Sequence, residues 1–169
     1  MLRIFAAIAL LLASFGLAGH ARAEEPVLLD LSTPEQVATA LQGAGYKAEI
    51  KTYKDGERYI NSGVNGQGFS VDFYNCEAGK CIALQFNSWW KAEPIFTQAL
   101  ANEWNDSRRF LRVSLDKEGN LREWLDFSVA GKLTKENFAD VVDWYAAMDS
   151  ELSKFLTEKR KAAKAGAKK

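Results

Sequence analysis

Cys76 and Cys81 are the only thiols in the chain, and their spacing offers the clearest chemistry in the sequence. Four residues separate them, within the segment FYNCEAGKCIALQF at residues 73–86. Such a pair could act as a metal clip, a redox pair or a staple across a hairpin. Two thiols do not complete the four-ligand shell of structural zinc, and CxxxxC lacks the CxxC spacing of helix-opening redox motifs.

Alternating apolar and polar residues on both sides of the cysteines predict two antiparallel strands, 69–76 and 81–88. If residues 77–80 form the loop, Phe73 lies opposite Leu84, and the two thiols face each other on the polar side. Opposed residues in such a pair lie within disulfide range. We therefore expect a disulfide that fixes the register and adds little entropic stabilisation. A redox-labile pair, free thiols and a metal site remain alternatives.

Other groups suited to catalysis are scarce. The single histidine is His20, so residues 24–169 lack the imidazole that triads, many metal sites and proton shuttles use. Glu103 and Asp106 have the spacing of a solvated helix face, which fits them better than a hydrolase dyad. The glycines of GVNGQG, residues 63–68, lack the Lys-Ser/Thr of a phosphate-binding loop. The sequence predicts no enzyme, cofactor or metal, with carboxylate-only catalysis as the alternative.

The N-terminus, residues 1–23, predicts a secretory signal peptide. Arg3 supplies a positive start, residues 4–18 are almost wholly apolar, and Ala-Arg-Ala at 21–23 has the small-x-small pattern of a cleavage site. The apolar run is shorter than the roughly twenty residues of a membrane span, although an uncleaved anchor is an alternative. We expect cleavage after Ala23, a periplasmic or secreted protein, and no membrane span in the remaining chain.

The rest of the chain divides into one domain, residues 24–156, and a basic tail, residues 157–169. The tail, TEKRKAAKAGAKK, has six basic residues, one acidic residue and no large apolar residue, which is typical of a disordered, solvated end. Alternatively, the tail touches anionic surfaces. Without the tail the domain is acidic, which argues against nucleic acid as a partner.

The order of elements expected in this domain is αββββαββα. Ser32 or Thr33 caps a helix that begins at Pro34, and Thr134 caps the last helix. Short turns join most strands, so we expect a mainly antiparallel sheet with helices on one face, an α+β two-layer sandwich. A second helix is expected at 94–105, with strands at 46–53, 58–62, 69–76, 81–88, 109–116 and 121–129. The apolar stripe of the last helix is expected to comprise Phe138, Val141, Val142, Tyr145, Met148, Leu152 and Phe155.

Aromatic residues off the apolar strand faces are candidates for partner binding. Trp124, Phe110 and Tyr74 are expected to form a patch on the open face of the sheet. Arg108 and Arg109, next to Phe110, either contact a carboxylate or face water. Alternatively, these aromatic rings are covered by another strand, a terminus or a second protomer. A homodimer would satisfy both interpretations.

The segment NEWNDSRRF, residues 102–110, resembles a block of the YbjN family of bacterial sensory transduction regulators. The similarity spans roughly residues 32–150 and includes GYKAEI, DGERYINS, FSVDFYNC, CIALQF, LRVSLDKEGNLREWLDF and FADVVDWY. The matching block contains Asn102, Trp104, Asn105 and Phe110. The asparagines are expected to form hydrogen bonds at the helix end, and Trp104 is expected to pack under the sheet.

The resemblance implies a fold similar to type III secretion chaperones, which are small α+β homodimers that bind extended segments of client proteins. It also implies a binding or regulatory module without catalytic residues. Exported proteins similar to this chain carry a hairpin cysteine pair like Cys76 and Cys81. We therefore expect a periplasmic module that binds a protein or peptide partner in a chaperone-like manner. A regulator of envelope stress or motility that acts through a membrane sensor is the alternative.

Overall fold

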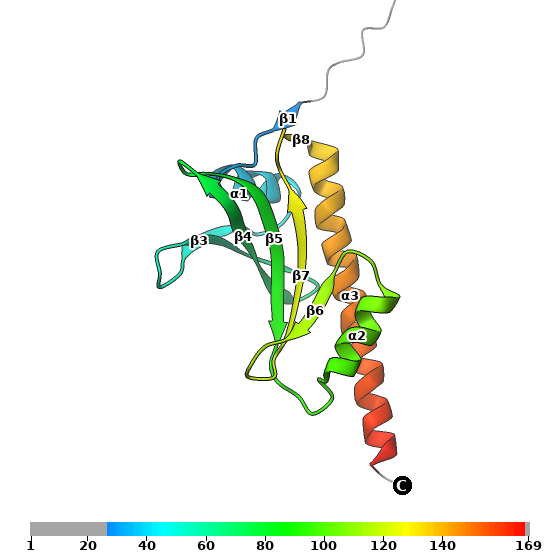
Figure 1. Cartoon of the computed structure of the whole chain (residues 1–169). Coiled ribbons are helices and arrows are strands. Elements are labelled where there is room, and N and C mark those ends of the chain that lie inside the picture. Colours follow the sequence, from blue (N-terminus) through cyan, green and yellow to red (C-terminus); the bar gives the residue numbers. More distant parts are fainter. Residues whose placement is uncertain (1–26, 168–169) are drawn as a thin grey trace, which may run out of the picture.

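Helices cover one face of a six-stranded sheet in the computed structural model, which describes residues 27–167 (Figure 1). The predicted signal peptide, residues 1–23, lies outside the described residues. The helices are α1 (Pro34–Gly43), α2 (Gln98–Ser107) and α3 (Lys135–Gly166). The strands are β1 (Leu28–Leu29), β2 (Glu49–Thr52), β3 (Arg58–Val64), β4 (Gln67–Glu77), β5 (Lys80–Trp90), β6 (Arg112–Leu115), β7 (Leu121–Ser128) and β8 (Leu133–Thr134).

The main sheet has the strand order β2-β3-β4-β5-β7-β6, and every neighbouring pair is antiparallel. This arrangement confirms the predicted α+β two-layer sandwich and the order of its large elements. The sequence did not predict β1 and β8, which pair with each other in a separate sheet. Each is two residues long, so neither shows the alternation by which a strand is predicted.

The β4–β5 hairpin has the predicted register. Phe73 pairs with Leu84, and Cys76 pairs with Cys81. The pairing continues to Glu77 and Lys80, so the turn contains two residues, not the expected four. Those two residues, Ala78 and Gly79, have φ values of 48° and 78°. Positive φ at both central positions is the geometry that matches the twist of a tight hairpin.

One continuous core lies between the sheet and the helices. Sheet residues Val71, Leu84 and Phe86 are fully buried, and α1 contributes Val37 and Leu41 at the same exposure. Helix α3 contributes the largest buried stripe, which consists of Phe138, Val142, Tyr145, Leu152 and Leu156. Apolar residues that recur at three- and four-residue spacing place this long helix flat against the sheet.

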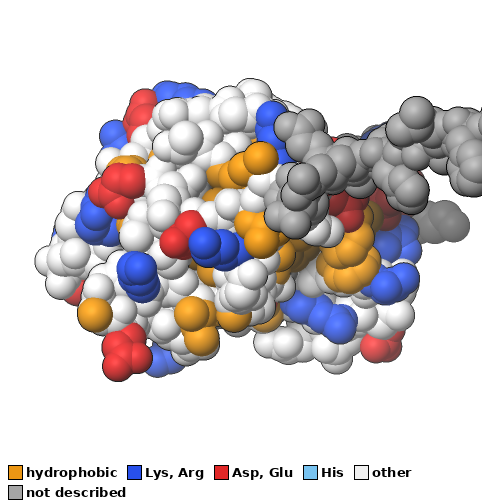
Figure 2. Space-filling model, turned by 90° about the horizontal axis from the view of Figure 1, so that it is seen from above, with side chains coloured by type: hydrophobic (Ala, Val, Ile, Leu, Met, Phe, Trp, Pro, Cys, Tyr) orange, Lys and Arg blue, Asp and Glu red, His pale blue; other side chains and the backbone are white. Residues whose placement is uncertain are grey.

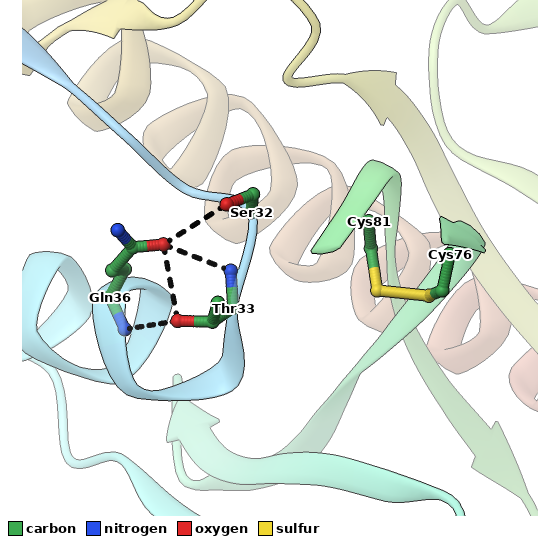
Figure 3. The surroundings of a disulfide bond; sticks show 5 residues. All are labelled: Ser32, Thr33, Gln36, Cys76 and Cys81. Atoms are coloured by element: carbon green, nitrogen blue, oxygen red, sulfur yellow. Dashed lines mark hydrogen bonds between the residues drawn. A yellow bond between two sulfur atoms is a disulfide. The ribbon is translucent and has the colours of Figure 1, made fainter. Parts of the chain in front are cut away.

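The predicted cap of α1 is present and lies close to the hairpin disulfide (Figure 3). The Thr33 hydroxyl accepts a hydrogen bond from the Gln36 backbone N–H at 3.4 Å, and the Gln36 side chain accepts one from the Thr33 N–H at 3.1 Å. The Cys81 N–H donates to the Ser32 carbonyl at 2.8 Å. The cap segment therefore lies beside the start of β5, beyond Ser128, the last residue of β7 that pairs with β5.

Helix α3 extends through Gly166, so the prediction of a disordered tail from residue 157 is wrong. Leu156 is fully buried, and two cations beyond it hold the helix to the domain. Lys159 forms an ion pair with Glu103 of α2, and Arg160 makes a two-point contact with Glu93. The composition of this segment suggests a solvated end. These ion pairs and the unbroken helix nevertheless keep its backbone ordered through Gly166.

Other boundaries also differ from the predicted ones, most clearly those of α2, β2 and β6, which covers only Arg112–Leu115 of the predicted 109–116. Helix α2 begins after Thr97, whose hydroxyl accepts from the Leu100 N–H, so Pro94 lies in the preceding turn and not in the helix. Strand β2 covers only Glu49–Thr52 of the predicted 46–53. No helix within residues 27–167 combines the length and apolar character that crossing a membrane requires.

Candidate functional site

The three predicted patch aromatics do not form one surface. Tyr74 and Trp124 lie on the open face of the sheet, but Phe110 does not. Its ring stacks on Trp144 of α3 with a centroid distance of 4.3 Å. Phe110 has a positive φ of 66° where the chain leaves α2, and Leu111 after it is fully buried. This turn directs Phe110 toward the helix layer, which strand alternation alone does not predict.

The two arginines beside Phe110 are engaged within the chain. Arg108 Nε donates to Glu151 Oε2 at 2.9 Å, and its guanidinium lies 5.5 Å from the centre of the Trp104 ring. Arg109 lies over the ring of Phe110 at 4.7 Å. Arg108 therefore fits the expected contact with a carboxylate, but this carboxylate belongs to α3 of the same chain.

The Asn-Trp-Asn block joins α2 to β6. Trp104 is fully buried, and its Nε1 donates to the Leu111 carbonyl at 3.0 Å. The Asn105 amide donates to the Val113 carbonyl at 2.9 Å and accepts from the Val113 N–H at 3.0 Å. Asn105 therefore bonds to β6 instead of capping the end of α2, whereas Asn102 is exposed. The block is therefore structural in this molecule.

The two cysteines form a disulfide with an S–S distance of 2.06 Å. The expectation that both sulfurs face outward is wrong in part, because Cys76 is exposed while Cys81 is 5% exposed. The segment before α1 covers Cys81, whose N–H donates to Ser32. Within residues 27–167 no group of three or more His, Cys, Asp or Glu side chains is arranged to hold a metal ion.

A buried pair of carboxyl groups, Glu123 of β7 and Asp149 of α3, was not predicted. Glu123 is 1% exposed and accepts from the Tyr145 hydroxyl at 3.0 Å and from Trp90 Nε1 at 3.2 Å. Asp149 is 2% exposed and accepts from the Asn65 amide at 2.9 Å. Burial, reinforced by the neighbouring Asp149, raises the pKa of Glu123 from 4.5 to about 7. Burial also raises the pKa of Asp149.

The sequence contained signals for both buried acids. Glu123 has the same strand parity as Leu121 and Leu125, so alternation places it on the core face. Asp149 lies between Tyr145 and Leu152 at the spacing of the buried stripe of α3. Neither carboxyl lines the surface hollow on the open face of the sheet or the one between α1 and α3. The pair therefore joins β7 to α3 inside the protein and is closed to a substrate.

A polar hollow of about 500 Å³ lies on the open face of the sheet, and we call it the open-face hollow. The Tyr53 hydroxyl donates to Asp72 Oδ1 at 2.9 Å, and the Asn87 amide donates to Asp72 Oδ2 at 2.8 Å. Tyr53 stacks on Tyr59 with a centroid distance of 4.0 Å. The lining of the hollow includes Tyr53, Tyr59, Asp72, Asn87, Trp89 and Arg122.

A second, apolar hollow of about 460 Å³ lies between α1, α3 and β1, and we call it the α1–α3 groove. Its lining includes Leu29, Leu31, Ala40, Phe138 and Ala139, with Asp30, Glu35 and Lys135 among the polar residues. Next to it, Val27 and Leu28 are 78% and 52% exposed. Figure 2 views the end of the molecule that carries β1 and β8, where hydrophobic side chains gather among charged ones. The shape and lining suit an apolar segment with charged flanks.

Comparisons with known proteins agree with this fold. Residues 33–156 match the family model YbjN, described as "Putative bacterial sensory transduction regulator". The crystal structure of YbjN from E. coli is similar to this chain with a TM-score of 0.50 and 17% identity, over 76% of this chain and 92% of that one. Comparison with curated proteins gives no match.

The family match covers most of the described chain and includes α1, the main sheet, α2 and the buried part of α3. The solved structure supports the same fold, although its low identity carries no information about a ligand. The chain therefore belongs to the YbjN family of bacterial regulators.

Proposed function

We propose that this YbjN-family protein is an exported, non-catalytic regulatory module that binds an apolar segment of a protein or peptide partner. The observation that carries the proposal is the α1–α3 groove, whose lining is mostly aliphatic and aromatic. A groove of this kind binds apolar side chains and gains free energy from the water that they displace. The family is described as regulatory, which is consistent with binding in place of turnover.

The charged residues around the groove indicate which kind of partner segment it favours. Asp30 and Glu35 lie at the α1 side, and Lys135 lies at the start of α3. Charges of both signs around an apolar centre favour a segment that has hydrophobic anchors and charged ends, since rim charges add specificity more than affinity. Export rests on the predicted signal peptide, so a mature protein that begins at Glu24 and fractionates with the periplasm is the expected result.

Site-specific photo-crosslinking tests the groove directly. A photoreactive amino acid replaces Thr39, an exposed residue that lines the groove, and in a matched control it replaces the exposed Lys117 in the β6–β7 turn. The Thr39 probe is expected to capture a defined partner in cells, identified by mass spectrometry, and Ala40→Glu is expected to abolish the capture. A charge placed on this half-buried groove position opposes an apolar ligand without removing a core side chain.

Three results would contradict the proposal: no capture from Thr39, equal capture from Lys117, or capture that survives Ala40→Glu. A captured second copy of this chain would assign the groove to self-association instead. A captured membrane sensor protein would favour a regulator that acts through that sensor, whereas several captured extended clients would favour a chaperone-like role. Thermal unfolding of Ala40→Glu shows whether its fold is intact.

A further inference from the structure

We propose that the open-face hollow binds a neutral glycan chain, a function separate from the partner groove on the helix side. The hollow extends over the side of the sheet that the helices leave uncovered. Its lining residues come from β3, β4, β5 and β7, from the β6–β7 turn, and from Tyr53 in the connection between β2 and β3. Four adjacent strands at about 4.8 Å per step span roughly 14 Å, which is long enough for a short oligosaccharide.

Aromatic side chains provide surfaces on which sugar rings can stack. Trp89 is 63% exposed, although a ring of this size is usually mostly buried in a protein. Tyr53 and Tyr59 form a second aromatic surface, with their rings stacked at an interplanar angle of 15°. The weakly polar C–H face of a pyranose packs well on such rings, because the aromatic face is electron-rich and apolar.

The side chains between these aromatic surfaces are short hydrogen-bonding groups. Asp72 is held by Tyr53 and Asn87 through one hydrogen bond to each oxygen, so its position is fixed before any ligand arrives. A carboxylate has about four acceptor sites, so Asp72 can still accept from sugar hydroxyls. The Arg122 side chain forms no ion pair or hydrogen bond with the part of the chain that the structure describes, so its guanidinium N–H groups can donate.

The charge of the lining distinguishes among ligands. Asp72 and Asp116 supply two carboxylates, whereas Arg122 is the cation that lines the same hollow. This excess of negative charge repels phosphates and polyuronates, so a nucleic acid or an anionic glycan is disfavoured. An apolar peptide could pack on the aromatic rings of this surface. It would leave the polar side chains between the rings without hydrogen-bond partners. A neutral, hydroxyl-rich chain satisfies both the rings and the polar side chains between them.

Calorimetric titration of the folded, disulfide-bonded protein tests the assignment. The probes are the neutral oligosaccharides chitotetraose, cellotetraose and maltotetraose, with a tri-galacturonate and an oligo-dT as anionic comparisons. At least one neutral probe is expected to bind at about 1 mM or below. Trp89→Ala is expected to weaken that binding about tenfold, because it removes one stacking surface. Asp72→Asn is expected to weaken it as well while conserving the shape of the side chain.

Trp144→Ala is the matched control, since Trp144 is also exposed but lies on α3 against Phe110. It is expected to bind the glycan like the wild type. Three results would overturn the assignment: none of the neutral probes binds at about 1 mM, Trp89→Ala and Trp144→Ala behave alike, or an anionic probe binds more tightly. The Ala40→Glu variant is expected to bind glycan normally, so this test and the partner test fail independently.

Discussion

Replacing Glu123 by Gln is expected to remove most of the pH dependence of stability between about pH 5 and pH 7.5. Glu123 is buried beside Asp149, and its other neighbours are the Tyr145 hydroxyl and the Trp90 N–H. The six ion pairs of residues 27–167 involve other carboxylates, so no cation compensates for a charge at this position. The native structure therefore favours protonated Glu123.

The sign follows from the direction of the pKa shift. Burial, and then the proximity of Asp149, raises the pKa of Glu123 from 4.5 to about 7 in the folded protein. The stabilisation is complete below about pH 4.5, and it is lost as the pH rises toward 7, because the unfolded chain releases the proton first. A shift of this size corresponds to about 3 kcal/mol, and the raised pKa of Asp149 acts in the same direction.

Groups with lowered pKa values act at a more acidic pH. Glu49 has its pKa lowered to about 2 by hydrogen bonds from Lys47 and Lys51, so its contribution is present above 4.5 and is lost below it. Above about pH 5 the raised pKa of Glu123 lowers the stability, and at more acidic pH the lowered pKa of Glu49 does so. We therefore expect maximal stability near pH 5. The window between pH 5 and 7.5 therefore reports mainly on the buried pair.

Urea unfolding at pH 5 and pH 7.5 measures the effect, with the m-value as a check that both transitions expose the same surface. The wild type is expected to lose about 2 kcal/mol of unfolding free energy over this range, because part of the Glu123 effect falls outside it, and Glu123→Gln is expected to lose much less. Glu118→Gln, at an exposed carboxyl in the β6–β7 turn, is the matched control and should keep the wild-type slope. Equal stability of the wild type at the two pH values, or an unchanged slope in Glu123→Gln, would refute the reasoning.

Three further predictions concern stability. The double variant Cys76→Ser/Cys81→Ser is expected to lose about 2 kcal/mol in urea unfolding, as its small loop implies, and a variant that does not fold would contradict this. Asn105→Ala is expected to lose about 2 kcal/mol, because it leaves a backbone N–H and C=O of β6 unpaired, whereas the exposed Asn102→Ala should be nearly neutral in the same assay. Truncation after Glu158 removes the two terminal ion pairs and is expected to cost about 1 kcal/mol, a loss that high salt should reduce; full stability of the truncated protein would contradict the observed docking of the helix end.

Strand alternation was the most informative signal in the sequence. It predicted the pairing of Phe73 with Leu84, and hence the opposition of Cys76 and Cys81, because a one-residue slip would move every apolar side chain to the wrong face. Alternation fails at Ile82, because it places Ile82 on the same face as the buried Leu84, yet Ile82 is 50% exposed. The core does not extend to the hairpin tip, and the position of the core boundary depends on tertiary packing.

The candidate surfaces were harder to predict than the fold. Trp89 was expected to follow its strand, but β5 extends through Trp90 and presents Trp89 on the open face. The hollow there gathers side chains from four strands and two connecting segments, so it depends on strand order, which local patterns do not determine. The α1–α3 groove depends on the two-residue β1, which brings Leu29 and Leu31 against the start of α3.

The positions of the titratable groups support binding over catalysis. A buried pair of acids is the feature that would favour an enzyme using carboxylates alone, and this chain contains one in Glu123 and Asp149. General acid–base catalysis, however, requires the carboxyl to reach a proton on the substrate. This pair is covered by Tyr145 and Trp90, while the accessible Asp72 accepts hydrogen bonds from Tyr53 and Asn87. The acids with raised pKa values are therefore closed to solvent, and the open surfaces offer rings, apolar walls and hydrogen-bonding groups, which is consistent with the proposed binding function.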